Sequence, residues 1–323
     1  MRVSVIVPTY RRPDQLLACL EGLRRQTRPA QQVLVIHRDE DSATLAALAA
    51  LDRSGLALQI LAVGEPGVVA ALNRGLEQAE GDIVAMTDDD AVPQPDWIER
   101  LVRAFADPSL GAVGGRDECF FDGKPADWPR IAAVGYTTWY GQTVGNFQVG
   151  IGPPRRVEML KGVNMSFRRA AIGGLRFDTR LLGRGAQFAN EMMFCFALRR
   201  AGWEILYDPD ILVHHHPGVR HEADQRVGIV YEAQRDMHHN MSLCYLECTP
   251  WHRAWRSILW RLATGSRKSP GLAAALVMSL RGLPGMWTGF AAQIDGHRRA
   301  IRVWRATRGE RHAPWRRATT RPR

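Results

Sequence analysis

The stretch "AMTDDDAVPQPDWIERLV", residues 85–102, places three consecutive aspartates directly after an apolar run. The run "IVAM", which ends at Met86, is typical of a buried strand, and the segment around Pro95 opens a helical pattern. Carboxylates this close together repel one another unless a cation or hydrogen-bond donors stabilise them. The three aspartates therefore form either a solvated turn before the helix or a ligand set for a divalent cation, and the surrounding sequence has to decide.

Strand-like and helix-like patterns alternate around this stretch. Continuous apolar runs at residues 3–10, 32–37, 56–63 and 82–87 are separated by segments with leucine or alanine at helical spacing. Runs that are apolar throughout are buried on both faces of a sheet, and their alternation with helices is typical of parallel strands. The sequence therefore predicts an α/β fold with a largely parallel sheet.

Polar clusters follow three of the predicted strands: "PTYRR" (8–12), "HRDED" (37–41) and "TDDD" (87–90). In open α/β sheets, ligands bind beyond the carboxyl ends of the strands. Carboxylates at that edge suit Mg²⁺ or Mn²⁺, which takes oxygen ligands from one or two carboxylates together with phosphates. Such a cation would remove the repulsion among the aspartates and screen a diphosphate bound beside them.

The composition is that of a globular protein, with 46% hydrophobic and 24% charged residues in a chain of 323. This length suggests one large or two moderate domains. The five cysteines, an odd number without a CxxC pair, indicate reduced thiols and a cytoplasmic protein. The segment "MRVSVIVPTY" has the pattern of a strand rather than a signal peptide, and no uncharged apolar run reaches the about 18 residues of a membrane span.

The net charge of +10 is unevenly distributed along the chain. Residues 250–323 hold 16 Lys and Arg against two acids, a net charge of +14, so residues 1–249 carry −4. The same region holds six of the ten tryptophans, and one helical stripe is apolar: Trp251, Trp255, Ile258, Leu259 and Leu262. Two interpretations stay open: contact with an anionic membrane surface through residues 250–317, or a helical subdomain packed on the core. Nucleic acid is not the expected partner, and we expect the end of the chain to be disordered.

Two blocks of the first half resemble the nucleotide-binding half of glycosyltransferase family 2, which has the GT-A fold. They are "VSVIVPTYRRPDQLLACLEGLRRQT" from Val3 and "GVVAALNRGLEQAEGDIVAMTDDDAVPQPDWIERL" from Gly67. Three blocks of the second half continue the resemblance in the family's order: "LKGVNMSFRRAAI", "FDTRL" and "NEMMFCFALRRAGWEILYDPDILVHHH". The resemblance implies an inverting enzyme that moves a sugar from a nucleotide diphosphate to an acceptor hydroxyl.

In this resemblance, the three aspartates are the DXD-type motif of the donor site. Asp90 would bind a metal ion that holds the diphosphate, whereas Asp88 would contact the ribose or a water on the metal, with Asp89 beside them. A histidine six residues beyond Pro209 would be the second metal ligand, and this is His215. Because imidazole suits Mn²⁺ better than Mg²⁺, the resemblance favours manganese.

The resemblance also implies contacts between the donor's nucleotide and residues of several blocks: Pro8, Thr9, Tyr10, Arg11, Asp39 and Asn73. Arg11 stands where the family usually has asparagine, and its guanidinium could reach a donor phosphate. An acidic residue usually follows the second strand directly, but here two residues intervene before Asp39. Leu72 stands where arginine is frequent, so one phosphate or base contact is expected to be missing.

The expected catalytic base is Glu191. Counted back from Gly202, it occupies the place of the family's catalytic aspartate, and Asn190 replaces the acid that usually precedes it. Inverting transfer needs one carboxylate to take the proton of the acceptor hydroxyl as that oxygen attacks the anomeric carbon. The resemblance places Gly162 and Asn164 on the acceptor side.

We therefore expect a GT-A catalytic domain at residues 1–245, followed by a Trp- and Arg-rich helical extension at 246–323. Within the catalytic domain, residues 1–115 would bind the nucleotide sugar and 116–245 would supply the acceptor side and the base. The donor would carry UDP, GDP or dTDP, and the acceptor would be a lipid-linked or cell-surface glycan at the cytoplasmic face of a membrane. Two rivals remain: a sugar nucleotidyltransferase, whose glycine-rich phosphate loop is missing here, and a catalytically silent nucleotide-sugar- or glycan-binding protein.

Overall fold

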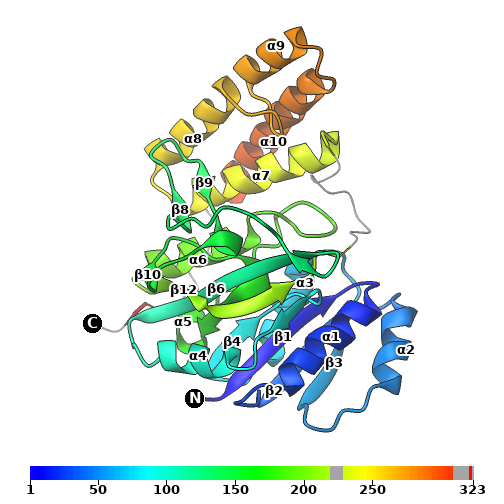
Figure 1. Ribbon diagram of the computed structural model, residues 1–323. Helices are drawn as coiled ribbons and strands as arrows, with labels where there is room; N and C mark the ends of the chain where they lie inside the picture. Colours follow the sequence, from blue (N-terminus) through cyan, green and yellow to red (C-terminus); the bar gives the residue numbers. More distant parts are fainter. Residues whose placement is uncertain (219–227, 308–319, 322–323) are drawn as a thin grey trace.

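A ten-stranded mixed sheet forms the centre of the computed structural model, which describes residues 1–218, 228–307 and 320–321 (Figure 1). The strand order is β10-β12-β6-β11-β4-β1-β2-β3, with β5 paired to β12 and β7 paired to β6. Helices cover both faces of this sheet, so the predicted α/β class is confirmed. The disorder predicted for the end of the chain concerns residues that lie outside the described part.

The first half of the chain builds the parallel part of the sheet. Its strands are β1 (Val3–Thr9), β2 (Gln32–Arg38), β3 (Leu58–Val63) and β4 (Ile83–Met86). Its helices are α1 (Pro13–Arg24), α2 (Ser42–Ala50) and α3 (Val68–Gln78). Successive residues of β1 point to opposite faces, so Val5 and Val7 join the apolar cluster with α1 whereas Ile6 joins the one with α3. Gly75 of α3 allows this approach, because a Cβ there would lie 2.6 Å from Ile6 Cγ2.

The second half adds the antiparallel part of the sheet. β11 (Met165–Arg168) runs antiparallel to both β4 and β6 (Leu110–Phe121), and β12 (Glu204–His215) runs parallel to β6. The short β5 (Ala91–Pro93) pairs with β12 in a register that aligns Ala91 with His215. This pairing brings the backbone that follows the aspartates beside the histidine predicted to bind metal.

Smaller elements complete the sheet domain. They are α4 (Trp97–Ala104), β7 (Lys124–Pro125), β8 (Tyr136–Thr137), β9 (Thr143–Val144), η1 (Phe147–Val149), β10 (Arg155–Arg156), η2 (Gly162–Asn164), α5 (Arg169–Ile172) and α6 (Asn190–Arg200). Of these, α6 has the longest buried stretch, from Met192 to Leu198, and it packs between the sheet and the helices that follow.

Four helices form a further layer beyond α6 (Figure 1): α7 (Tyr231–Cys248), α8 (Trp251–Ala263), α9 (Leu272–Leu280) and α10 (Met286–Thr307). α7 and α10 pack closely at Gly296, where a Cβ would lie 2.4 Å from the carbonyl oxygen of Arg235. Leu243 of α7 and Ile258 of α8 share one apolar cluster with Phe194 of α6, so this layer is continuous with the core. The domain boundary expected at residue 245 lies inside α7, and the division into two domains stays a prediction.

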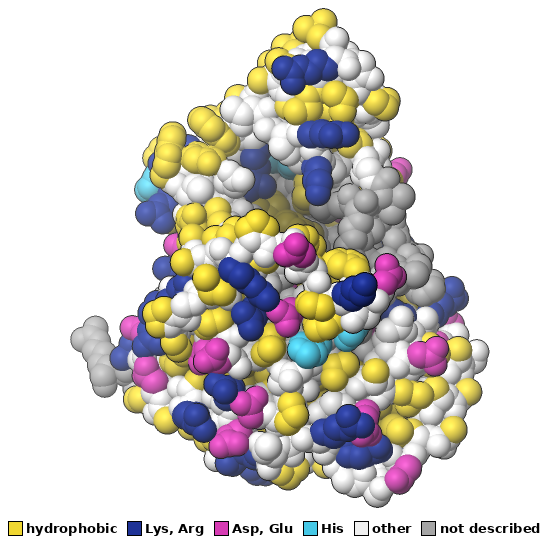
Figure 2. Space-filling model, in the orientation of Figure 1, with side chains coloured by type: hydrophobic (Ala, Val, Ile, Leu, Met, Phe, Trp, Pro, Cys, Tyr) yellow, Lys and Arg dark blue, Asp and Glu magenta, His cyan; other side chains and the backbone are white. Residues whose placement is uncertain are grey.

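None of the helices in the described part of the chain is long and apolar enough to cross a bilayer. Hydrophobic side chains are nevertheless exposed at the end of the molecule where α9 lies, next to Lys and Arg (Figure 2).

Candidate active site

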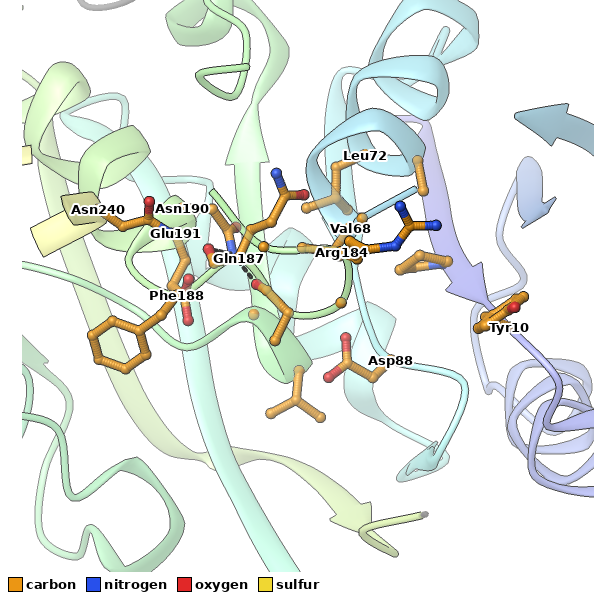
Figure 3. Close-up of a pocket in the computed structure, with 18 of the residues that line it drawn as sticks. Tyr10, Val68, Leu72, Asp88, Arg184, Gln187, Phe188, Asn190, Glu191 and Asn240 are labelled. Carbon is orange, nitrogen blue, oxygen red and sulfur yellow. Dashed lines mark hydrogen bonds between the residues drawn. The ribbon is translucent and has the colours of Figure 1, made fainter. Parts of the chain in front are cut away.

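A cavity of about 710 Å³ lies at the carboxyl ends of β1 and β4, the place that an open α/β sheet offers to a ligand. Its wall combines the β1–α1 loop, the residues after β4, the loop before α6, and parts of α7 and α10. Figure 3 shows Asp88 and Glu191 directed into it from elements far apart in the sequence. The sheet domain and the helical layer therefore share one site.

The three aspartates have different surroundings. All three line the cavity, but Asp89 and Asp90 are buried and Asp88 is more exposed. Arg12, in the loop before α1, places Nη1 3.1 Å from Asp89 Oδ1 and 2.7 Å from Asp90 Oδ2. Burial raises the pKa of Asp89 to about 7, even though Arg12 acts in the opposite direction. The repulsion within the motif is thus offset by an arginine that the sequence analysis did not single out.

Asp90 and His215 form the next contact, with 3.4 Å between Asp90 Oδ1 and His215 Nε2. The other ring nitrogen, Nδ1, is 3.4 Å from Asp117 Oδ2, and Lys161 donates a hydrogen bond to the same oxygen. Burial opposes the charge of Asp90, but interactions with His215 and Arg12 lower the pKa of this carboxyl. Asp117 therefore fixes the imidazole with Nε2 toward Asp90, an arrangement common behind metal-binding histidines.

These residues fit a divalent cation. Asp89 Oδ2 and Asp90 Oδ1 are buried carboxylate oxygens that accept no hydrogen bond from the described residues. Together with His215 Nε2 they offer the oxygen and imidazole ligands that Mn²⁺ accepts. Asp117, Cys119 and His215 also have ligand atoms within 4.8 Å of one another, but the ammonium of Lys161 already supplies a cation to Asp117. We therefore assign Asp117 and Lys161 to the support of His215.

Glu191 lies in the first turn of α6, with its side chain in the cavity wall. The turn before it is tight: Gln187 and Ala189 have φ angles of 42° and 72°, in the left-handed region. The backbone there is held by Asn190, whose amide donates to the carbonyl oxygens of Ala186 and Gln187. The asparagine that replaces an acid of the family thus shapes the turn that presents Glu191.

Gln187 connects this turn to the donor half. Its Oε1 accepts a hydrogen bond from Val69 N at 2.9 Å, and its Nε2 donates to Leu181 O. The N-cap of α3 is Gly67, which has no side chain, and a Cβ there would lie 2.2 Å from Gln187 Oε1. Gln187 therefore takes the place of the missing cap residue of α3. Sequence analysis missed it because the two partners are 118 residues apart.

The structure sorts the predicted donor contacts into two groups. Pro8, Thr9 and Tyr10 line the cavity, and beside them so do Arg12 and Arg38, which were not predicted to do so. Arg11 and Asp39 do not line it. Arg11 has a φ of 55° and donates its backbone N–H to Asp41, which also caps α2, while Asp39 is exposed.

Two predicted asparagines use their amides inside the protein. Asn73 exchanges hydrogen bonds with the backbone of Phe177 in both directions. Asn164 is buried, accepts from Trp97 Nε1 and donates to the carbonyl oxygens of Arg116 and Ile211. Neither asparagine lines the cavity, whereas Gly162 does.

Known proteins resemble the chain in both sequence and structure. A glucosyl-dolichyl phosphate glucuronosyltransferase of Haloferax volcanii is 29% identical over 67% of this chain and 69% of its own length. The succinoglycan biosynthesis protein ExoM of Rhizobium meliloti is 24% identical over 86% and 85%.

Solved structures share the fold at low sequence identity. The mannosyltransferase PcManGT of Pyrobaculum calidifontis, in complex with GDP-Man and Mn²⁺, matches with a TM-score of 0.54 and 19% identity over 93% of this chain and 87% of its own. Residues 1–349 of S. aureus TarS with UDP-GlcNAc match with a TM-score of 0.54 and 17% identity over 95% and 92%. These likenesses confirm the GT-A fold.

The family model described as "Glycosyl transferase family 2" matches residues 4–173, which include the aspartate motif and the strands that lead to the cavity. With the fold, the cavity and the relatives in agreement, the chain belongs to glycosyltransferase family 2.

Proposed function

We propose that the protein is a metal-dependent, inverting glycosyltransferase that moves a sugar from a nucleotide diphosphate to an acceptor hydroxyl. The observation that carries this proposal is the meeting in one cavity of Asp88, Asp90 and His215 with Glu191. The first three would bind the charged donor, and the glutamate would act on the acceptor. The other donor contacts would come from Pro8, Thr9 and Tyr10 and from Arg12 and Arg38.

Asp90 and His215 would hold the metal ion, Mn²⁺ rather than Mg²⁺. A bound cation would stabilise the negative charge that develops on the leaving diphosphate. Asp88 would position the donor through the ribose or a metal-bound water, and Asp89 would keep its place through Arg12. The PcManGT structure named above, which contains Mn²⁺ and a nucleotide sugar, supports this assignment by likeness of fold.

Glu191 would be the base. Its carboxylate takes the proton of the acceptor hydroxyl while the hydroxyl oxygen forms a bond with the anomeric carbon and the bond from that carbon to the diphosphate breaks. Attack from the side opposite the leaving group inverts the anomeric carbon, and no covalent enzyme intermediate is needed. Since Glu191 lies in the first turn of α6, the positive end of the helix dipole favours a negative charge on this side chain.

For the acceptor, we propose a lipid-linked or cell-surface glycan. The first relative described above is named for a dolichyl phosphate-linked substrate and the second for polysaccharide biosynthesis. The donor's nucleotide would be UDP, GDP or dTDP. The protein would work peripherally at the cytoplasmic face of a membrane, with the cationic region of residues 250–317 toward anionic lipid; residues 308–317 lie outside the described part.

The variant Glu191→Gln tests this mechanism, because glutamine keeps the size of the side chain and removes its basicity. We expect turnover to fall by about 10²- to 10⁴-fold while nucleotide binding is unchanged. Glu232→Gln is the matched control, since this glutamate also lines the cavity. A loss of turnover in Glu232→Gln alone would move the base to α7. A wild-type protein that binds nucleotide but transfers sugar to no acceptor would favour the silent binding protein instead.

A further inference from the structure

The outer side of α9 is apolar and has no covering element among the described residues. Leu272, Leu276 and Leu280 recur every fourth residue and are 45%, 47% and 88% exposed, with Val277 beside them at 48%. The opposite side of the helix packs inward through the buried Ala274 and Ala275. Trp287, at the start of α10, extends the same apolar end of the molecule and is half exposed. We call these five exposed side chains the α9 face: Leu272, Leu276, Val277, Leu280 and Trp287.

Cations flank the α9 face, and acids are absent from its surroundings in sequence. Arg267 and Lys268 precede α9 and Arg281 follows it, and all three are exposed. From Thr249 through Ile294 the chain has six Lys and Arg and no Asp or Glu. Figure 2 shows hydrophobic side chains and dark blue Lys and Arg together at this end, and Figure 1 places α9 at the opposite end of the molecule from the N-terminal strands.

We propose that the α9 face is the membrane-docking element of this protein and that α9 lies in the plane of an anionic bilayer surface. A helix of nine residues is far too short to span a bilayer, but its leucines can enter the acyl boundary while flanking cations meet lipid phosphates. Tryptophan is favoured at that boundary. An apolar helix with cations before and after it is complementary to the surface of an anionic bilayer.

A second copy of the chain fits this face less well. In a two-fold symmetric dimer a patch meets itself, so the cations that flank one α9 would approach those that flank the other. Anionic lipid provides the opposite charge instead.

This docking site differs from the one that the sequence indicated on α8. Of the predicted stripe, Ile258 is buried, and Trp255 and Leu262 pack against the core. Only Trp251 and Leu259 remain exposed, at 74% and 62%. Helix periodicity revealed an apolar stripe on α8, but α7 covers much of it in the fold.

The inference rests on the proposed function in one respect: if the acceptor is lipid-linked, the α9 face sets the distance between the membrane and the cavity. α10 runs from Trp287 in the α9 face to Arg299 in the cavity lining. Twelve residues of α helix separate the two, a distance of about 18 Å along the axis. With the α9 face on the bilayer, the cavity lining at Arg299 would therefore lie at most roughly that far beyond Trp287, and a lipid-linked acceptor would have to span this distance.

The test is co-sedimentation of the full chain with vesicles of phosphatidylcholine alone or mixed equally with phosphatidylglycerol. The wild type should bind the anionic vesicles and not the neutral ones. Leu276→Glu with Leu280→Glu should weaken that binding by roughly tenfold or more, because each leucine loses its apolar burial. The matched control, Trp251→Glu with Leu259→Glu, places two charges on the exposed side of α8 and should bind like the wild type.

A second pair, Arg267→Glu with Lys268→Glu, changes only the loop before α9. Weaker binding by this pair cannot be caused by a disrupted α9. The pair should also bind anionic vesicles more weakly, and the melting temperatures of all variants report their folding. Unchanged binding of both the leucine and the loop variants would overturn the inference, as would loss of binding in the α8 control alone. A wild type that binds neither vesicle but forms a dimer broken by Leu280→Glu would assign the face to a second copy. Mn²⁺-dependent nucleotide binding is measured separately, so the proposed transfer and the docking site can fail independently.

Discussion

At the scale of single residues, Arg12 explains how three adjacent carboxylates remain folded at the end of β4. Its guanidinium is within 3.1 Å of both Asp89 and Asp90, and all three aspartates line the cavity. Removing one partner of a buried ion pair leaves an uncompensated charge, so this arginine contributes to stability as well as to the site. A metal ion would share with Arg12 the task of neutralising the motif.

The sequence predicted the main residues of the cavity but not the partners that fix their side chains through hydrogen bonds and ion pairs. Asp88 and Asp90 could be predicted because the carboxyl ends of parallel strands meet at one edge. Arg38, not Asp39, reaches the cavity because β2 continues through residue 38 and neighbouring side chains of a strand point to opposite sides. Asp117 gave no comparable pattern, since its partnership with His215 depends on the register of β6 and β12.

We predict that Asp117→Asn weakens metal binding. The amide cannot hold the imidazole of His215 as the carboxylate does, and loss of such support typically costs about 10- to 100-fold in metal affinity. The melting temperature measured at increasing Mn²⁺ concentrations gives the midpoint of metal binding. Asp122→Asn, in the exposed turn after β6, is the control and should titrate like the wild type. Equal Mn²⁺ midpoints for both variants would contradict a supporting role for Asp117.

At the scale of elements, the start of α3 and the turn before α6 are joined by Gln187. Val68 N donates to Gly185 O at 2.9 Å, and Val69 N donates to the side chain of Gln187. The donor half and the turn that presents Glu191 are therefore hydrogen-bonded to each other. A substitution that shifts the start of α3 should therefore also shift the turn that presents Glu191.

Gln187→Ala should lower both stability and turnover. Loss of the cap of α3 costs about 0.5–2 kcal/mol in the free energy of unfolding. Because the turn to Glu191 loses its anchor, kcat should fall more than KM rises. Chemical denaturation and steady-state kinetics measure the two effects, with Gln59→Ala on the exposed side of β3 as the control. A variant that loses stability but keeps the wild-type kcat would show that Gln187 caps α3 without positioning Glu191.

The contact between α7 and α10 contains buried histidines. His297 Nδ1 is 2.6 Å from Ser242 Oγ, and the ring of His238 is 5.2 Å from that of His297. Burial, followed by the charge of Arg261, lowers the pKa of His297 to about 3. Burial likewise lowers the pKa of His238 well below its ordinary value. Both rings are therefore neutral in the folded protein.

Acid should loosen this contact. A histidine whose pKa is depressed by folding stabilises the protein above its unfolded pKa, near 6.5, and that stability is lost as pH falls toward 3. Protonation of one such histidine on unfolding changes the free energy of unfolding by about 1.4 kcal/mol per pH unit. His297→Phe should remove this contribution from the slope of the free energy against pH. Urea unfolding at several pH values between these limits measures the slope. The same slope in the variant and the wild type would contradict the assignment.

At the scale of the whole molecule, the cavity belongs to two layers. Residues of the sheet domain supply the aspartates and the histidine, whereas Asn240 of α7 and Arg299 of α10 close the other side. The alternating patterns predicted the parallel strands of the first half, β1 to β4, with the helices between them. They could not predict the helical layer's position, because an apolar stripe on α8 does not specify which neighbour covers it.

The central claim, a nucleotide-diphosphate donor held through a metal ion, is tested most directly by thermal shift. UDP, GDP and dTDP are compared with and without Mn²⁺ on the wild type and on Asp90→Ala. We predict that one nucleotide stabilises the wild type only with Mn²⁺, by about 2.7 kcal/mol at a ligand concentration of 100 times Kd. The same nucleotide should not stabilise Asp90→Ala. Stabilisation that is equal in the variant, or absent for all three nucleotides, would contradict the account.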